Sequence, residues 1–415
     1  MEAIGQDEFA GLMARLGPWS STRRVAIGVS GGADSMCLAS LAAGWGNPLA
    51  LIVDHRLRPD STAEATLTAS RLATRGIEAR ILTLHGLTPG PGLPARARAA
   101  RYAALTQAAN AAGLTDLLLA HHASDQAETL LMRRNAHSAP SGLAAMSAIT
   151  ETPALRLVRP LLTLPPGRLR ATLRAHGIPW AEDPSNANTL ALRTRLRQAL
   201  ADPDGDTPAT AALVAEAGGH ARNRAAAQTC LAAELAARAT LFPEGHAILL
   251  PGPISADGLA ALIRALSGSP YAPRGAALRR LAAQLSGPGS HAATLGGIRL
   301  MPAGRLGPGT LLVREPSAMQ APIEAANGTE WDRRFTLAVE GSLPAGTMIG
   351  ALGEDAVGLP RHDLPHAVLC TLPALRAPCG AYAVPHLRHF YGWTNPSLRL
   401  TLTPLNPVAG ASFHL

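Results

Sequence analysis

The 415-residue sequence contains no lysine, and all 37 of its basic residues are arginines. The absence of lysine excludes the commonest phosphate-binding loop, Gly-x-x-x-x-Gly-Lys-Ser/Thr, in which a lysine ammonium bridges the terminal phosphates. The chain is nevertheless basic, with a formal net charge of +8 and an isoelectric point near 10.3. Arginine pairs with phosphates and stacks on bases, so this excess favours a polyanionic partner. A compositional bias would explain the missing lysine, but not the positive excess.

Cysteine, aromatic residues and long apolar runs are also scarce. The four cysteines form no Cys-x-x-Cys pair, which argues against a zinc ribbon or a disulfide framework and favours a reduced compartment. Aromatic residues make up 3% of the chain, so the cores must be aliphatic. No stretch approaches the roughly 18 to 20 apolar residues of a membrane span, and the N-terminus lacks the apolar core of a signal peptide. We therefore expect a soluble, cytoplasmic protein with no membrane partner.

The most informative segment follows the apolar run of residues 25–29, which predicts a buried strand. Adjacent glycines allow a sharp turn and close approach of a ligand, and the helix start that follows favours an anion. Asp34 would repel phosphate unless a divalent cation such as Mg²⁺ lies between them. The segment predicts a nucleotide and a metal bound together, with a plain glycine-serine turn as the alternative. Its six residues are Ser30, Gly31, Gly32, Ala33, Asp34 and Ser35.

The first half of the chain alternates predicted strands and helices. A capping box of Ser61 and Glu64 is predicted to open one of the helices. Repeated strand-helix-strand units predict an α/β fold with a doubly wound parallel sheet. In such sheets ligands bind at the carboxyl ends of the strands, where the glycine-rich loop should meet the polar residues that follow two further strands. The strands are expected at residues 25–29, 49–53, 80–84 and 116–120, and the helices at 36–43, 61–75, 95–112 and 125–134.

A polar cluster follows the fourth predicted strand. On a helix that starts near residue 124, Asp125 and Glu128 lie on one face, with His121 and His122 just before the helix. A histidine at this place could take a proton from an attacking amine, and the carboxylates could hold a cationic substrate. A metal site is one alternative, and acids that merely stabilise the helix dipole are another.

The rest of the chain carries fewer signals. Three arginines at alternate positions, Arg193, Arg195 and Arg197, could clamp phosphate or form a solvated basic helix face. A linker is predicted at residues 202–208. We expect a catalytic domain over residues 1–205, a helical domain over 206–290 and a small β-rich domain over 291–415. Helices are predicted at residues 209–239, 255–266 and 274–285, and strands at 310–313, 335–339 and 398–402.

Together these segments resemble the tRNA(Ile)-lysidine synthase family, within the N-type ATP pyrophosphatases that share a PP-loop. The resemblance covers residues 24–197, and the order and spacing of its motifs make it strong. The chain departs from the family pattern at Ser124, where the family has aspartate, at residues 135–141, and at Thr194 within an Arg-Asn-Arg motif. The motifs are residues 30–35, 53–58, 98–102, 121–129, 142–146, 159–161 and 182–197.

The resemblance implies an adenine nucleotide alpha hydrolase-like domain followed by tRNA-binding domains. It also implies an ATP-dependent ligase that joins free L-lysine to C2 of the wobble cytidine in an isoleucine tRNA with a CAU anticodon. The cytidine carbonyl oxygen would attack the α-phosphate of ATP and release pyrophosphate. The ε-amino group of lysine would then displace AMP to give lysidine. No feature of the sequence indicates an oligomeric state.

The same resemblance assigns the ATP phosphates to residues 30–35, with Asp34 on Mg²⁺, and places Asp54 and His55 near the adenosine. These assignments agree with the phosphate-binding chemistry that the glycine-rich loop predicts on its own.

For the second half of the reaction, the resemblance assigns lysine recognition to Asp125 and proton acceptance to His121 or His122. An ATP-dependent tRNA thiolation enzyme with the same loop is the nearest alternative, but it would need nucleophilic or cluster-binding cysteines. A non-catalytic nucleotide- or RNA-binding module is the other. Contacts to phosphate or RNA are expected from Arg98, Arg101, Arg193, Arg195 and Arg197.

Overall fold

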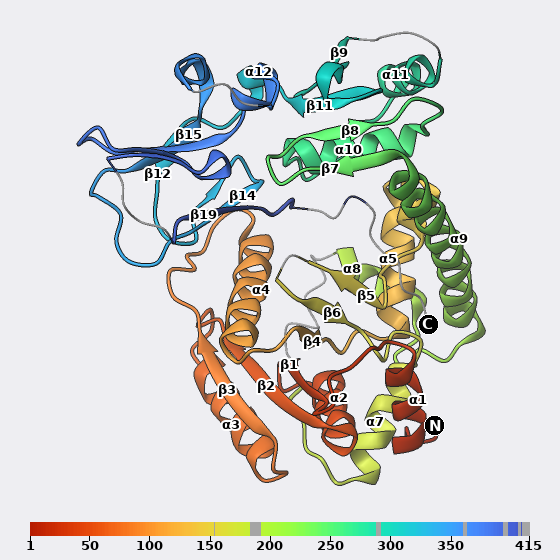
Figure 1. The fold of residues 1–415 in the computed structure, drawn as a ribbon. Coiled ribbons are helices and arrows are strands. Elements are labelled where there is room, and N and C mark those ends of the chain that lie inside the picture. Colours follow the sequence, from red (N-terminus) through yellow and green to blue (C-terminus); the bar gives the residue numbers. More distant parts are fainter. Residues whose placement is uncertain are drawn as a thin grey trace. The chain divides into compact units, whose positions relative to one another are not determined.

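The protein forms two compact units in the computed structural model (Figure 1). The first comprises Met1–Ala227, and the second comprises the described residues from Gln228 onward. The predicted domain boundaries near residues 205 and 290 stay predictions. The structure describes residues 1–152, 154–182, 192–287, 292–359, 363–392, 397–405 and 408, with only the backbone of residues 192–194.

The first unit is an α/β layer structure built on a six-stranded sheet. The strands lie in the order β3-β2-β1-β4-β6-β5; all neighbouring pairs are parallel except the last, in which β5 runs antiparallel to β6. This arrangement confirms the predicted doubly wound fold. The elements are α1 (Gln6–Ala14), β1 (Arg24–Val29), α2 (Ala33–Trp45), β2 (Asn47–Asp54), α3 (Ser61–Ala73), β3 (Glu78–Thr83), α4 (Leu93–Ala111), β4 (Asp116–Leu118), α5 (Ala123–Asn135), α6 (Pro140–Leu143), β5 (Ile149–Glu151), β6 (Arg156–Val158), α7 (Pro166–Ala175), α8 (Leu192–Leu200) and α9 (Pro208–Arg238), which continues into the second unit.

The central strands are apolar throughout because both faces of the sheet are covered. Along β1, Ile27 points to a core shared with α2 and α7, whereas Ala26 points to a core shared with α4. Along β2, Ile52 and Leu51 divide in the same way. Successive side chains of these strands point to opposite faces of the sheet, and both faces are apolar cores. The strands therefore appear in the sequence as continuous apolar runs without a polar stripe.

The start of α3 differs from the prediction. The expected capping box of Ser61 and Glu64 is wrong, because Asp60 occupies the N-cap position and no side chain caps the helix. The Ser61 hydroxyl instead donates to Asp54 at the end of β2, 2.8 Å away. A nearby buried carboxylate therefore takes the hydroxyl that the local pattern assigned to the helix.

Asp202 fixes the turn between α8 and α9. Its carboxylate accepts hydrogen bonds from the backbone of Gly205 and from both the backbone and the hydroxyl of Thr207. The Thr210 hydroxyl adds a further bond. Burial would raise the pKa of Asp202, but these bonds outweigh it and lower the pKa to about 2.

The second unit contains antiparallel sheets and two amphipathic helices. The sheet orders are β7-β8-β11-β10-β9, β12-β15-β16-β17-β18 and β13-β14-β19. The helices and strands predicted for this half are confirmed to within a few residues. In the part of the chain that is described, no helix is long and apolar enough to cross a bilayer. The elements are β7 (Ala239–Leu241), β8 (Ala247–Leu249), α10 (Ala256–Ser267), α11 (Ala276–Ser286), β9 (Ala293–Leu295), β10 (Ile298–Pro302), η2 (Gly304–Leu306), β11 (Thr310–Arg314), η3 (Pro316–Ala318), β12 (Ile323–Glu324), β13 (Glu330–Trp331), β14 (Phe335–Ala338), β15 (Met348–Ala351), η4 (Gly353–Gly358), α12 (His366–Leu369), β16 (Pro373–Arg376), β17 (Tyr382–Val384), η5 (Pro385–Leu387), β18 (His389–Tyr391) and β19 (Arg399–Leu402).

Candidate active site

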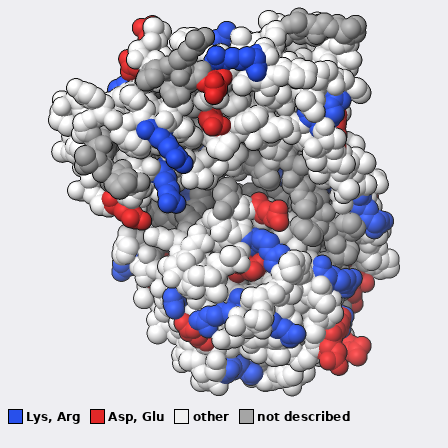
Figure 2. All heavy atoms as spheres, in the orientation of Figure 1, with Lys and Arg blue, Asp and Glu red and all other residues white. Residues whose placement is uncertain are grey.

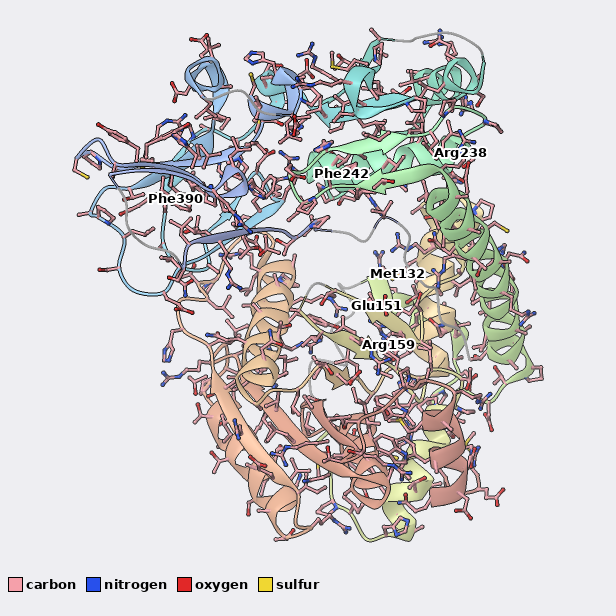
Figure 3. The ribbon with its side chains drawn as sticks, in the orientation of Figure 1. Met132, Glu151, Arg159, Arg238, Phe242 and Phe390 are labelled. Carbon is pink, nitrogen blue, oxygen red and sulfur yellow. The ribbon has the colours of Figure 1, made fainter. Side chains whose placement is uncertain are left out.

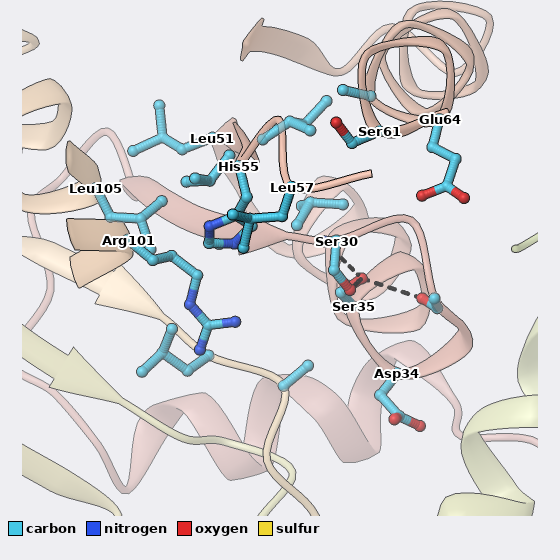
Figure 4. Close-up of a pocket in the computed structure, with 18 of the residues that line it drawn as sticks. Ser30, Asp34, Ser35, Leu51, His55, Leu57, Ser61, Glu64, Arg101 and Leu105 are labelled. Carbon is cyan, nitrogen blue, oxygen red and sulfur yellow. Dashed lines mark hydrogen bonds between the residues drawn. The ribbon is translucent and has the colours of Figure 1, made fainter. Parts of the chain in front are cut away.

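A cavity of about 440 Å³ lies in the first unit at the carboxyl ends of β1, β2 and β4 (Figure 4). Loops after these three strands line it together with the starts of α2 and α3 and one face of α4. The topology of a doubly wound sheet predicts a ligand site at this edge. Seven of the predicted site residues line the cavity: Ser30, Gly32, Asp34, Ser35, His55, Arg101 and His121.

The two loop glycines serve different purposes. Gly31 has a φ of +87°, and a Cβ there would lie 2.4 Å from the Thr68 hydroxyl, so the backbone requires glycine. Gly32 has an ordinary φ of −73°, and its Cβ would meet nothing closer than Ser30 Oγ at 3.6 Å. The protein itself does not require glycine at position 32, and the missing side chain leaves space at the cavity wall.

Ser35 ties the loop to the first turn of α2. Its hydroxyl donates to the Gly32 carbonyl at 3.0 Å and accepts from the Ser30 backbone N–H at 3.1 Å. The Ser30 and Ser35 hydroxyls also contact each other at 3.2 Å (Figure 4). Because the first N–H groups of a helix have no partner within the helix, the loop held by these hydrogen bonds can direct donors toward an anion.

Asp54 does not line the cavity. It is 2% exposed, and its carboxylate accepts hydrogen bonds from Ser61 Oγ, Thr62 Oγ1 and the Arg56 backbone N–H at 2.7–3.0 Å. Burial would raise the pKa of Asp54, but these three bonds lower it. The carboxylate thus fixes the turn after β2 that presents the next residue, His55, to the cavity. The predicted place of Asp54 near the adenosine stays a prediction.

His55 lines the cavity, and its ring lies beside the Arg101 side chain in Figure 4. Burial lowers the pKa of His55, and the positive charge of Arg101 lowers it further. Its Nδ1 is buried and finds no hydrogen-bond partner among the described residues. A neutral imidazole with an unused nitrogen can donate to or accept from a polar ligand in this cavity.

The second polar cluster contains two carboxylates around His122. His122 Nε2 lies 3.5 Å from Asp34 Oδ2 and 3.6 Å from Asp125 Oδ2. Burial alone would lower the pKa of His122, but Asp125 and Asp34 outweigh it and raise the pKa. Asp125 also accepts the His122 backbone N–H at 3.1 Å, so it caps α5 as well as facing the imidazole. The structure thus joins the loop after β1 to the residues after β4.

Glu128 is part of this region, although the sequence assigned it no definite partner. Its side chain is fully buried, and Oε1 accepts a 2.8 Å bond from Arg197 Nε on α8. Arg197 is separated from Glu128 by 69 residues, and no local pattern connects them. The ion pair places Arg197 beside the cluster of Asp34, His122 and Asp125, which contributes to its raised pKa.

Ser124, where the chain departs from the family pattern, lies beneath the turn that Asp202 fixes. Its side chain is buried, and a Cβ at Gly205 would lie only 2.5 Å from Ser124 Oγ. The close approach of this turn leaves little room for a longer side chain at position 124.

The other predicted arginines are distributed unevenly. Arg98 and Arg101 flank the Tyr102 ring, with guanidinium carbons 5.0 and 5.5 Å from its centroid. Arg195 is exposed on α8, and the side chain of Arg193 lies outside the described residues, as do the acidic-turn residues 183–186. The structure therefore places Arg101 at the cavity and Arg197 against Glu128. Arg195 neither lines the cavity nor pairs with Glu128.

Asp34 is suited to a magnesium ion bound together with phosphate. Its side chain is 40% exposed and lines the cavity next to the loop. Mg²⁺ commonly takes one or two carboxylates and completes its shell with phosphate oxygens and water. Within the described ranges, no three His, Cys, Asp or Glu side chains converge as a complete metal site. A single carboxylate beside a phosphate-binding loop fits an ion that arrives with its nucleotide.

Comparison with known proteins agrees with this site. Residues 2–203 match the PP-loop domain family. A tRNA(Ile)-lysidine synthase of Ruegeria pomeroyi is 35% identical over 390 residues, covering 90% of each chain. The enzyme of the same name from Brucella anthropi is 34% identical, covering 78% of this chain and 76% of its own. One from a Bradyrhizobium species is 42% identical over 207 residues, but that match spans only 48% of this chain and 58% of the relative. The chain belongs to the tRNA(Ile)-lysidine synthase family.

Proposed function

We propose that this protein ligates free lysine to the wobble cytidine of an isoleucine tRNA with a CAU anticodon, using ATP and releasing pyrophosphate and AMP. The observation that carries the proposal is the position of Asp34. This residue belongs to the phosphate-binding loop and also lies 3.5 Å from His122 in the second polar cluster. An adenylated base and an incoming amine must meet at such a junction.

The loop and the start of α2 bind the ATP phosphates through backbone N–H groups and the Ser30 hydroxyl. Asp34 holds Mg²⁺, which would neutralise charge that develops on the phosphates. His55 and the apolar side chains Leu51 and Leu105, which also line the cavity, contact the adenosine. Asp54 acts indirectly, by fixing the turn that positions His55.

The lysine ammonium binds near Asp125, because its carboxylate faces the cluster and is 14% exposed. The amine must lose a proton before it can attack, and a neutral histidine can accept it. His122 is suited to this role because its neighbouring carboxylates stabilise the imidazolium that forms. His121 lines the cavity and is the second candidate.

The RNA substrate contacts the arginines around the cavity, with Arg98 and Arg101 on α4 the best placed of the predicted set. The excess positive charge supports a nucleic-acid partner, and guanidinium groups supply paired donors to phosphates. We place the reaction in the cytoplasm, where tRNA, ATP and free lysine are all present.

The alternative of a tRNA thiolation enzyme has less support. Cys37 is the one cysteine of the first unit, but it is buried, and burial raises the pKa of its thiol to about 12. Such a thiol is a poor nucleophile at neutral pH. The other cysteines, Cys230, Cys370 and Cys379, belong to the second unit.

The proposal is tested by incubating the protein with ATP, an isoleucine tRNA transcript and each of the twenty amino acids in turn, and measuring AMP release. Release that depends on lysine alone supports the ligase. Sulfur incorporation with a sulfur donor would support the thiolation enzyme instead, and tight binding of tRNA without AMP release would indicate a non-catalytic module. Asp34→Ala should abolish pyrophosphate release, whereas wild-type turnover in that variant would contradict the metal role.

A further inference from the structure

Arg159 is a buried cation for which the proposed reaction has no assigned role. It follows β6 directly and so lies at the same sheet edge as the cavity, beyond the end of β4 (Figure 3). The residue is 7% exposed. Arg159 is not among the residues that line the ATP cavity.

The guanidinium is only partly satisfied by the protein. Nη1 donates to the Ser147 carbonyl at 2.8 Å and to Thr150 Oγ1 at 3.0 Å. Nε is buried and has no hydrogen-bond partner within the described part of the chain. No carboxylate of the described residues pairs with Arg159.

The surroundings of Arg159 are positive. Burial lowers the pKa of Arg159; Tyr102 opposes this shift, and the positive charge of nearby Arg98 adds to it. Arg98 donates to the Tyr102 hydroxyl at 3.3 Å, and Arg101 stacks on the same ring. Arg224 approaches from α9 and donates to Ser147 Oγ at 2.6 Å. Among the described residues, none of these four arginines has an acidic partner. The face in Figure 2 carries both signs of charge, so the protein surface does not lack acidic side chains.

Such an arrangement is unfavourable unless an anion completes it. A buried charge without a counter-ion is unfavourable because it has lost its hydration, and a second cation nearby adds repulsion. The polar contacts to Ser147 and Thr150 hold the guanidinium in place but do not neutralise it. An anionic group of the substrate would neutralise the Arg159 guanidinium while the substrate is bound.

The chemistry of the group indicates which anion. Arg98 and Arg101 flank the half-buried ring of Tyr102. Guanidinium donors beside an aromatic ring are typical of surfaces that bind nucleic-acid backbone and bases. The ATP phosphates are assigned to a cavity that Arg159 does not line, whereas Arg101 on the same helix as Arg98 and Tyr102 does line it. Arg159, Arg98 and Tyr102 therefore lie outside the nucleotide cavity, and Arg101 connects them to its wall.

We propose that Arg159, together with Arg98 and Tyr102, forms a subsite for a backbone phosphate of the RNA substrate at the rim of the nucleotide cavity. The inference rests on the proposed function, since it assumes that the substrate is RNA. Arg159 supplies the buried guanidinium, Arg98 the exposed one, and the Tyr102 ring orients Arg98.

The test is the salt dependence of binding to a fluorescently labelled isoleucine tRNA transcript, measured by anisotropy. Arg159→Gln should weaken binding roughly tenfold at moderate salt and reduce the slope of log K against log salt by about one. Arg75→Gln is the matched control, because Arg75 is exposed at the end of α3, at the opposite edge of the sheet, and the substitution removes the same charge. It should leave the slope unchanged.

Folding effects are separated by two further measurements. Arg159→Lys keeps the charge and a donor for Ser147, so it should fold normally and keep the slope while losing affinity through the missing fork. Arg98→Gln changes an exposed residue and should reduce the slope in the same way as Arg159→Gln. The melting temperature of each variant shows whether a loss of tRNA affinity results from unfolding of the protein.

An unchanged slope in both Arg159→Gln and Arg98→Gln, with the wild-type chain still binding tRNA, would overturn the subsite and leave the proposed function standing. The same holds if Arg159→Gln weakens ATP binding and not tRNA binding, because the phosphate would then belong to the nucleotide. A wild-type chain that does not bind tRNA would overturn both.

Discussion

Removal of Arg197 should expose how strongly the buried Glu128 depends on it. The Glu128 side chain is fully buried, while Arg197 is 45% exposed and reaches it from α8 with a 2.8 Å bond. In Arg197→Met, the carboxylate would remain buried without its counter-charge. The alternatives for the chain are to protonate Glu128, to admit water or to detach α8, and each costs free energy.

The size of the effect follows from that burial. Breaking a buried ion pair by removing one partner typically costs about 3 to 5 kcal/mol. Because Arg197 is partly exposed, we take the lower end, about 3 kcal/mol. For a unit of 150 to 250 residues, each kcal/mol lowers the melting temperature by about 2 to 4 °C, which gives roughly 6 to 12 °C for the first unit.

Differential scanning calorimetry measures this change. Arg195→Met is the matched control, since Arg195 is exposed on the same helix two residues away and should change the melting temperature by less than about 2 °C. Adding Glu128→Gln to Arg197→Met should restore most of the loss, because the unpaired charge is then gone. The reasoning is refuted if Arg197→Met is no more harmful than Arg195→Met, or if Glu128→Gln restores nothing.

Gly31→Ala should destabilise the first unit by about 1 to 3 kcal/mol in urea unfolding, because φ is +87° and the new Cβ would clash with Thr68; an unchanged midpoint would contradict the strain. Asp125→Asn should lower the pKa of His122, because the Asp125 carboxylate is one of the two that raise it; histidine ring signals in NMR report that pKa, and the rise of activity with pH should move to lower pH. An unmoved titration would show that Asp125 does not act on the imidazole. Asp202 has a pKa of about 2 in the folded chain against an ordinary 3.8, so its stabilisation, roughly 2 kcal/mol, is present above pH 4 and lost as the pH falls toward 2. Wild type and Asp202→Asn should therefore converge in stability on acidification, and a constant difference would contradict the assignment.

The sequence predicted much of the fold because its signals are local. Apolar runs such as residues 25–29 and 49–53 identify strands covered on both faces, and strand-helix alternation then determines a parallel sheet. The loop of residues 30–35 combined glycine geometry with a carboxylate, which indicated nucleotide and metal together. Both the fold class and the family were confirmed.

The parts that were wrong or missed depend on contacts between distant residues. Ser61 was expected to cap α3, but its hydroxyl donates to Asp54, and this bond exists only once β2 and α3 are placed side by side. The pairing of Glu128 with Arg197, and the fact that no carboxylate among the described residues pairs with Arg159, also depend on tertiary structure. A single sequence shows which residues are charged, but not which charges are buried or neutralised.

The most direct test of the account is the fate of lysine. Purified protein is incubated with ATP, Mg²⁺, radiolabelled lysine and an isoleucine tRNA transcript with a CAU anticodon, and the tRNA is then digested to nucleosides. We expect label in a single modified nucleoside derived from the wobble cytidine, with one AMP released per lysine incorporated. AMP release without label in the tRNA, or label at any other nucleotide, would contradict the central claim.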